Sequence, residues 1–323
     1  MVFLNRVFSV RPAAQTGFKR TSERLQQTSN ARIPYSGQQG HTFLRNDHSH
    51  RRLRPLVSTP KKLAPGFAES RRTVVAVAAQ TSATESQGTN PYAGIKAFVA
   101  GATGGTGRKI VEELVAKGIP VRALVRDKSK ASDLLVDGVE VVEGDVYQYM
   151  TLPKALGDCN VVFCATGSRE PLDPLGPFTV DYNGTVNLVN VAARAGKVKH
   201  FVFVTSIGTD DILFPLNLFW GVLFWKKRAE EALQRSGLTY TIVRPGGLKN
   251  EPEDGSGKGN VIMKGPNSFG LPPREQPGSI LREQVAEVCV AALIEEEAAN
   301  KIVEVISKES ADEQSMSDLF AGV

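Results

Sequence analysis

The segment Gly101-Ala102-Thr103-Gly104-Gly105-Thr106-Gly107 decides the fold that we predict for this chain of 323 residues. It follows the apolar run 97–100 and precedes the helical pattern of 108–117, so the order is strand, glycine turn, helix. Gly101 allows the tight turn, Gly104 lets main-chain amides approach a diphosphate, and Gly107 lets the helix pack closely on its strand. The helix start adds a partial positive charge. We therefore predict a dinucleotide-binding loop formed by Gly101, Thr103, Gly104, Gly105, Thr106 and Gly107.

The second predicted strand ends about 20 residues beyond the glycines, where dinucleotide folds place a side chain near the adenosine ribose. Arg126 and Asp127 stand at that end. A carboxylate there accepts hydrogen bonds from the free 2′-hydroxyl of NAD, whereas a guanidinium pairs with the extra phosphate of NADP. Because Arg126 comes first, we predict NADP(H) in preference to NAD(H). Asp127 is interpreted as the N-cap of the short helix that follows.

Apolar strand patterns and helical patterns alternate beyond residue 93. Runs such as 161–165 and 201–204 are continuously apolar, which is typical of strands covered on both faces. The pattern predicts an α/β protein with one doubly wound parallel sheet of the Rossmann type and a small C-terminal substrate-loop region. The irregular stretch 250–277 is either that loop or a surface insertion. We place strands at 96–100, 121–125, 139–143, 160–165, 200–205, 239–243 and 301–306, and the main helices at 108–117, 181–195 and 226–235.

The charge of the chain is divided unevenly. Residues 1–80 carry 14 basic and three acidic residues, a balance of +11, whereas the remainder is acidic at −6. The basic pI is therefore a property of the leader, so no nucleic-acid partner is predicted. The leader is rich in Ser, Thr, Gln and Arg and has no long apolar run, which favours an organelle transit peptide, plastid before mitochondrion. We predict a disordered transit peptide over 1–80, a linker over 81–93, the NAD(P)-binding domain over 94–308 and a C-terminal tail over 309–323.

The cysteines and histidines indicate no metal site. Cys159, Cys164 and Cys289 lack metal-ligand spacing, and their neighbours predict buried, reduced thiols. Three histidines lie in the leader, and His200 precedes a strand. Catalysis that depends on histidine is not supported.

Several further motifs occur in an order that carries a family resemblance. They are Val125-Arg126-Asp127, Gly144-Asp145-Val146, Ala165-Thr166-Gly167, Asp181-Tyr182-Asn183-Gly184-Thr185, Val204-Thr205-Ser206 and Val243-Arg244-Pro245-Gly246-Gly247. Over about residues 94–308 the chain resembles the NmrA-like branch of the atypical short-chain dehydrogenases/reductases. Within that branch it is similar to plastid NADP(H)-binding proteins that include a component of the inner-envelope translocon. The long C-terminal repeat region of that component, which recruits a reductase partner, has no counterpart here.

This resemblance implies roles for individual residues. Asp145 and Val146 would flank the adenine, Ala165, Thr166 and Gly167 would run under the ribose, and Pro245 would border the nicotinamide. Asp145 as a loop cap and Pro245 as a plain strand exit remain alternatives.

The reaction centre expected of this superfamily is incomplete. Its usual members combine a serine at the end of the fifth strand with a tyrosine four residues before a lysine, and the lysine lowers the tyrosine pKa. Ser206 and Lys226 are the candidate catalytic residues, and Lys226 is also a candidate ligand of the coenzyme ribose. The tyrosine position is Val222. An acceptor that takes its proton from water, such as a flavin or quinone, would need only a held nicotinamide.

The apolar run 212–225 contains both tryptophans. It is shorter than the roughly 20 residues that cross a bilayer. It predicts a core or partner-facing helix, or a surface that lies on the thylakoid or envelope membrane with Lys226, Lys227 and Arg228 reaching the headgroups.

The sequence as a whole leaves two functions open. The first is a stromal, NADP(H)-binding plastid protein that senses the reduced pool or serves as an accessory. The second is an NADPH-dependent oxidoreductase that acts on a flavin, quinone or small carbonyl compound.

Overall fold

The computed structural model describes residues 90–168, 172–251 and 258–323. The predicted transit peptide and most of the predicted linker lie outside these residues. The described strands are β1 (Ala97–Ala100), β2 (Val121–Val125), β3 (Val139–Glu143), β4 (Val161–Cys164), β5 (His200–Val204), β6 (Tyr240–Pro245), β7 (Gly247–Lys249), β8 (Asn260–Lys264), β9 (Ser279–Leu281) and β10 (Lys301–Lys308). The described α-helices are α1 (Gly105–Ala116), α2 (Leu152–Leu156), α3 (Thr185–Ala195), α4 (Val222–Gln234), α5 (Arg282–Ala291) and α6 (Met316–Ala321).

One twisted sheet organises the domain, with strand order β3-β2-β1-β4-β5-β6-β10-β9-β7 and β8 paired to β10. The strands from β3 to β10 along this order are parallel, whereas β8 and β9 pair antiparallel with β10. The order reverses between β1 and β4, which is the switch point where doubly wound sheets bind their ligands. The predicted Rossmann fold is confirmed.

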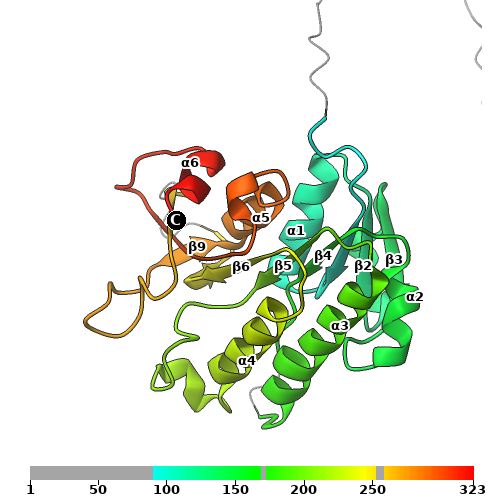
Figure 1. The fold of residues 1–323 in the computed structure, drawn as a ribbon, viewed down its shortest axis with the longest axis horizontal. Coiled ribbons are helices and arrows are strands. Elements are labelled where there is room, and N and C mark those ends of the chain that lie inside the picture. The colour runs from blue at the N-terminus through cyan, green and yellow to red at the C-terminus, as the bar shows by residue number, and fades with distance from the viewer. Residues whose placement is uncertain (1–89, 169–171, 252–257) are drawn as a thin grey trace, which may run out of the picture. The chain divides into compact units, whose positions relative to one another are not determined.

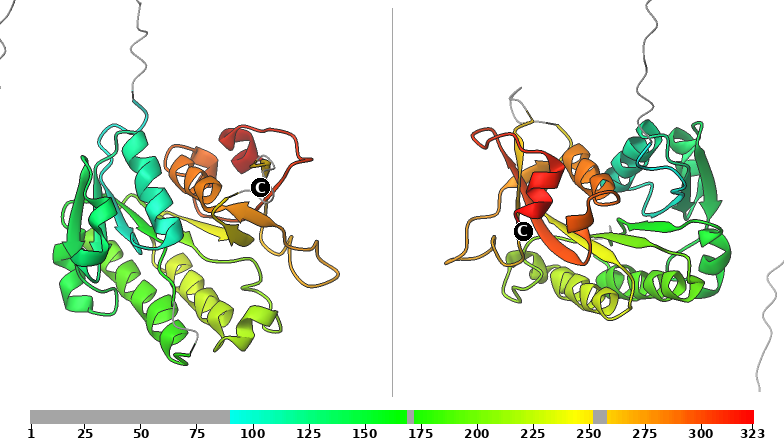
Figure 2. Two further views of the ribbon diagram at one scale, coloured as in Figure 1. Left: turned by 180° about the vertical axis from the view of Figure 1, so that it is seen from behind. Right: turned by 45° about the horizontal axis from the view of Figure 1, so that its top comes forward.

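Both faces of the sheet are covered by helices. Helices α1 and α5 lie on one face, while α3 and α4 lie on the other (Figures 1 and 2). Within β1, Ala97 and Val99 pack on the α1–α5 side and Phe98 and Ala100 on the α3–α4 side, and all four are fully buried. This is why the strand reads as a continuous apolar run.

The region beyond β6 differs most from the expectation. The predicted irregular stretch 250–277 includes β8, and β9 follows it. The short strand β8 is specified by its antiparallel register with β10, from Glu304 opposite Lys264 to Lys308 opposite Asn260, which local sequence does not reveal. Residues 309–323, predicted as a tail, carry α6, whose Leu319 and Phe320 are buried in the core.

Arg244 of β6 is a fully buried cation within a cluster of carboxylates. Its guanidinium donates two hydrogen bonds to Glu230 of α4, at 3.0 and 2.6 Å, and also contacts Asp210 and Glu304. Burial by itself lowers the pKa of Arg244, but the hydrogen bonds and charges of Glu230 and Asp210 together raise it above its usual value, so the residue stays charged. Thr205, at the end of β5, donates to Glu230 at 2.7 Å.

Glu304 of β10 connects this cluster to a loop. Its carboxylate accepts hydrogen bonds from the amides of Asn267, Ser268 and Phe269, at 3.0, 3.0 and 2.9 Å. The Arg244 cluster therefore ties β5, β6, β10 and α4 to the loop after β8. A buried charge is tolerated only when it is paired and hydrogen-bonded in this way.

The cysteines behave as predicted. All three are buried free thiols. Burial raises the pKa of Cys159 to about 11, and it also raises the pKa values of Cys164 and Cys289. None of them is an activated thiolate.

His200 gives the domain a predictable response to acid. Thr241 donates its hydroxyl proton to the carbonyl of Ala298 at 2.7 Å, so its oxygen must accept the proton on Nε2 of the neutral His200, at 2.8 Å. Burial lowers the pKa of His200 from 6.5 to about 4. Its neutral form therefore contributes stability above pH 6.5 that is lost as the pH falls toward 4, because the unfolded chain binds the proton first.

We expect the free energy of unfolding to decrease by about 3 kcal/mol from this residue between pH 6.5 and pH 4, at about 1.4 kcal/mol per pH unit. Urea unfolding across that range, with His200→Gln as the comparison, measures the effect. The variant should show a shallower pH dependence. Identical slopes for the two proteins would contradict this account.

Candidate coenzyme-binding site

The glycine loop leaves no room for side chains at two positions. Gly101 has φ +83°, and a Cβ there would lie 2.5 Å from the carbonyl oxygen of Ala165 at the end of β4. A Cβ on Gly107 would lie 2.1 Å from the carbonyl oxygen of Gly101. The amide of Gly104 closes the turn onto the Gly101 carbonyl at 2.8 Å. The loop therefore brings the start of α1 to the carboxyl ends of β1 and β4, where helix amides can face a diphosphate.

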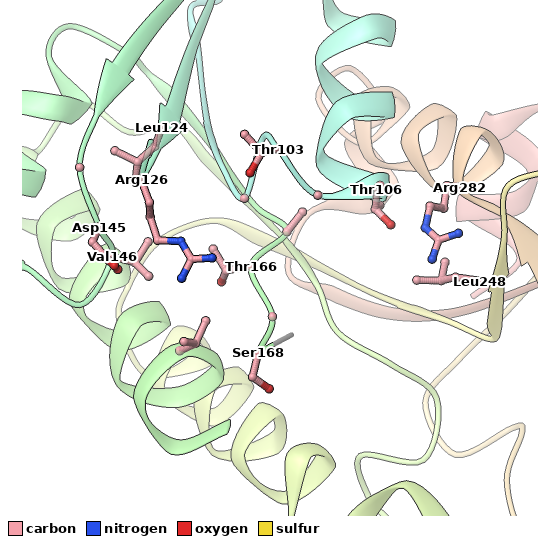
Figure 3. A pocket seen from close by; sticks show the side chains of 17 residues that line it. Thr103, Thr106, Leu124, Arg126, Asp145, Val146, Thr166, Ser168, Leu248 and Arg282 are labelled. Atoms are coloured by element: carbon pink, nitrogen blue, oxygen red, sulfur yellow. The ribbon is translucent and has the colours of Figure 1, made fainter. Parts of the chain in front are cut away.

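A cavity of about 340 Å³ lies in front of this loop (Figure 3). We call it the coenzyme cavity. It is lined by Gly101, Thr103, Gly104, Gly105, Thr106, Leu124, Arg126, Gly144, Asp145, Val146, Ala165, Thr166, Gly167, Ser168, Val180, Leu248 and Arg282.

Most of the predicted coenzyme ligands meet in this cavity, although they come from separate segments of the chain. Three do not line it. Gly107 lies behind the loop, Lys226 lines a neighbouring cavity, and Pro245 is buried at the end of β6, where it lines neither cavity. Six lining residues were not among the predicted ligands, namely Leu124, Gly144, Ser168, Val180, Leu248 and Arg282. Of these, Leu248 and Arg282 reach the cavity from β7 and from the start of α5.

Arg126 and Asp127 point to different places, and the predicted cap role of Asp127 is confirmed. The Arg126 side chain extends over the cavity floor beside Asp145, Val146 and Thr166 (Figure 3). The Asp127 carboxylate instead caps the turn Lys128–Lys130 and accepts from the amide of Ser129 at 2.9 Å. Hydrogen bonds from the Ser129 hydroxyl and amide lower the pKa of Asp127. Of the two residues, only Arg126 lines the coenzyme cavity, and its role at the adenosine end stays a prediction.

A second cavity of about 280 Å³ adjoins the first and shares Thr106, Ala165, Thr166, Gly167 and Leu248 with it. We call it the acceptor cavity. Its other lining residues are Val204, Thr205, Ser206, Leu216, Val222, Leu223 and Lys226. Both candidate catalytic residues therefore face the same space, on the side of the loop away from Arg126.

Lys226 is held by a buried carboxylate. Its Nζ lies 2.6 Å from Asp181 Oδ1, and the Asp181 side chain is fully buried. Asp181 belongs to a π-helical segment, Pro177–Gly184, and its other oxygen accepts from the amide of Ser168 at 3.1 Å. Such segments are frequent at functional sites. Asp181 belongs to the sequence motif 181–185, but the sequence does not indicate that it pairs with Lys226.

The described residues that line the acceptor cavity do not include the tyrosine that usually donates a proton to a carbonyl substrate. Ser206 donates to the carbonyl of Ile207 at 3.1 Å. Among the described residues, no tyrosine or histidine lines either cavity. The position of the usual phenol is Val222, at the start of α4.

The run 212–225 does not form one helix. It contains a 3₁₀ turn, Pro215–Leu218, and then the first turn of α4. The expectation of a core helix is wrong for most of the run, since Ile212, Leu213, Leu218, Phe219, Trp220 and Phe224 are exposed, with Leu213 and Leu218 more than 80% accessible. We call these six residues the apolar rim.

Two of the basic residues expected to reach lipid headgroups point inward. Lys226 pairs with Asp181 and Lys227 with Asp210, whereas Arg228 pairs with Glu231 at 2.7 Å on the surface. Within the described residues, no helix has the length and apolar character needed to cross a bilayer.

The comparison with protein families agrees with this geometry. The family model described as NAD(P)H-binding matches residues 101–296, from the glycine loop to beyond α5. The chain belongs to the NAD(P)H-binding family. The predicted resemblance is thereby confirmed, and the coenzyme is a nicotinamide dinucleotide.

Relatives of this NAD(P)H-binding protein occur in plastids. An uncharacterized chloroplastic protein of Arabidopsis thaliana is 43% identical over 241 residues, which is 71% of this chain and 82% of the relative. The chloroplastic protein TIC 62 of Pisum sativum is 40% identical over 238 residues, which is 66% of this chain and 43% of TIC 62. This chain therefore matches less than half of TIC 62. Sanguinarine reductase of Eschscholzia californica is 30% identical over 249 residues, which is 65% of this chain and 88% of the reductase. The chain is a chloroplast NAD(P)H-binding protein, as predicted.

Substitution of Arg126 tests the coenzyme preference. We expect Arg126→Ala to weaken NADPH binding by roughly 10- to 100-fold, the effect of losing hydrogen bonds to a charged group, and to leave NADH binding nearly unchanged. Fluorescence titration with both coenzymes measures the ratio. Lys128→Ala, which removes a nearby cation outside the cavity, is the control. An unchanged preference in Arg126→Ala would show that another group selects the phosphate.

Proposed function

We propose that this protein is an NADPH-dependent oxidoreductase that transfers hydride to a flat, conjugated acceptor. The observation that carries the proposal is the acceptor cavity. It continues from the coenzyme cavity and holds Ser206 and Lys226 on the side away from the adenosine end. A protein that only senses NADPH needs no such space beside the nicotinamide, so the cavity favours turnover over the sensing or accessory role.

The residues present suit an acceptor that needs no side-chain acid. NADPH supplies a hydride when bound. Lys226, fixed by Asp181, can hydrogen-bond the ribose hydroxyls, and Leu216, Val222 and Leu223 give the cavity one apolar wall. A quinone or oxidised flavin that accepts the hydride takes one proton from solvent, which leaves NADP⁺ and the reduced acceptor. The reductase among the relatives supports this class of reaction.

Turnover with defined acceptors tests the proposal. We expect NADPH oxidation with a short-chain quinone or a flavin at about 1 per second or faster, the usual range of enzymes. Val222→Phe narrows the acceptor cavity and should lower kcat/KM at least about tenfold while NADPH affinity stays constant, because only the acceptor loses space. Leu213→Ala, outside both cavities, is the matched control. Tight NADPH binding without turnover of any acceptor would leave the sensing role in its place.

We also propose that the apolar rim docks on a plastid membrane. The rim is formed by the same segment that walls the acceptor cavity, through Leu216 and Val222. Docking there would bring a lipid-soluble quinone to the mouth of the cavity. Because Lys226 and Lys227 are paired internally, attachment would rest on apolar insertion and not on headgroup charge.

Flotation with vesicles of thylakoid lipids tests the docking. We expect the protein to float with the vesicles at both low and high salt, and the double variant Leu218→Ser/Phe219→Ser to remain at the bottom of the gradient. Met150→Ser removes an equally exposed apolar side chain far along the chain from the rim and should float as the natural protein does. Release by salt alone would contradict apolar docking.

The composition of the leader and the chloroplastic relatives support the proposed processing. We propose that the leader 1–80 is a transit peptide that is removed on import, and that the domain, which begins at residue 94 and includes α6, functions without it.

A further inference from the structure

Arg282 is a second cation of the coenzyme cavity, and no sequence motif pointed to it. It is the first residue of α5, and its side chain lines the cavity together with Gly105, Thr106 and Leu248. Figure 3 shows it at the opposite end of the glycine loop from Arg126. The two guanidiniums therefore lie on either side of the position where the diphosphate would meet the loop.

The approach of Arg282 depends on the glycine at position 105. A Cβ on Gly105 would lie 2.8 Å from Nε and 2.9 Å from Cδ of Arg282, so the absence of a side chain gives the arginine its place. Its Nη1 donates to Asn250 Oδ1 at 2.7 Å. This bond fixes the side chain across the start of α1.

The local electrostatics favour an anion at this point. The helix dipole makes a cation unfavourable in the first turn of a helix, yet Arg282 begins α5 and faces the start of α1, which has no acidic residue in its first turn. The acidic residue in the first turn of α5 is Glu283, which is exposed and lies 3.9 Å from Lys258. The ion pairs of the described residues give Arg282 no carboxylate partner, so its charge at the start of α1 is left for an anion.

We propose that Arg282 donates hydrogen bonds to the diphosphate of the coenzyme from the side opposite the glycine loop, and so positions the nicotinamide toward the acceptor cavity. The inference rests on the coenzyme binding of the proposed function, not on its acceptor. An anionic acceptor is the weaker choice of ligand, because Arg282 lines the coenzyme cavity but not the acceptor cavity. Its role is a positioning role and differs from that of Arg126, which faces the 2′-phosphate.

Titration with intact coenzymes and fragments separates the two arginines. We expect Arg282→Ala to weaken NADPH and NADH by the same factor, roughly 10- to 100-fold, so that their ratio is unchanged, in contrast to Arg126→Ala. The fragment 2′-phospho-ADP-ribose, which keeps the diphosphate, should weaken in parallel. Adenosine 2′-phosphate, which lacks it, should bind as before. Arg282→Lys should recover part of the affinity.

Two further variants guard against a merely structural effect. Asn250→Asp places a carboxylate against the guanidinium and should weaken both coenzymes without removing a coenzyme contact, whereas Arg235→Ala, on the exposed end of α4, should change neither. Thermal unfolding of each variant reports folding. Unchanged affinity for 2′-phospho-ADP-ribose in a folded Arg282→Ala protein would overturn the inference, as would a natural protein that binds neither coenzyme. A protein that binds NADPH but reduces no acceptor contradicts the proposed function alone, and these binding ratios then still decide the role of Arg282.

Discussion

The buried guanidinium of Arg244 is the interaction on which the acceptor side of the molecule depends. Its carboxylate partners come from α4, β10 and the loop after β5, and the same carboxylates hold Thr205 and the amides of 267–269. Removal of the cation would leave Glu304 buried with only its amide hydrogen bonds, and Glu230 with Thr205 and the more distant Lys227, at 3.9 Å. Loss of one partner of a buried ion pair costs about 3 to 5 kcal/mol. The pairing therefore ties α4 to the ends of β5 and β6 through Glu230 and Thr205. Helix α4 carries Lys226, and Ser206 follows β5.

The coenzyme side depends on a different constraint, the absence of side chains. Gly101 and Gly107 bring backbone within contact of backbone, and Gly105 admits Arg282. The result is a surface of main-chain amides with a guanidinium at each end. The coenzyme cavity is thus specified by glycines, which have no side chain. The acceptor cavity is specified by paired charges on segments that are distant in the chain.

The sequence predicted the Rossmann sheet and most of the coenzyme cavity because those features are local or periodic. The glycine loop and the strand-end residue Arg126 follow from spacing along the first two strands, and the apolar strands follow from continuous apolar runs. Asp145 was implied by the family resemblance. Errors occurred where a feature depends on distant partners. Strand β8 exists through its register with β10, and Lys226 and Lys227 turn inward because Asp181 and Asp210 lie opposite them. In the sequence, Arg282 is recognisable only as a cation at the start of a predicted helix. This is a weak indication of a coenzyme ligand, because the sequence does not show that Arg282 lies against Gly105.

From sequence alone, this chain could be recognised as a plastid NAD(P)H-binding protein with a dinucleotide loop, an arginine at the adenosine end and no tyrosine at position 222. These properties depend on single residues or on short spacings, so they can be recognised without a structure. Only the tertiary structure brought Asp181 to Lys226, opened the acceptor cavity beside the coenzyme cavity, exposed the apolar rim and aimed Arg282 at the loop. Each of these features depends on contacts between side chains that are far apart in the chain. A local sequence pattern does not show which distant residues will come into contact.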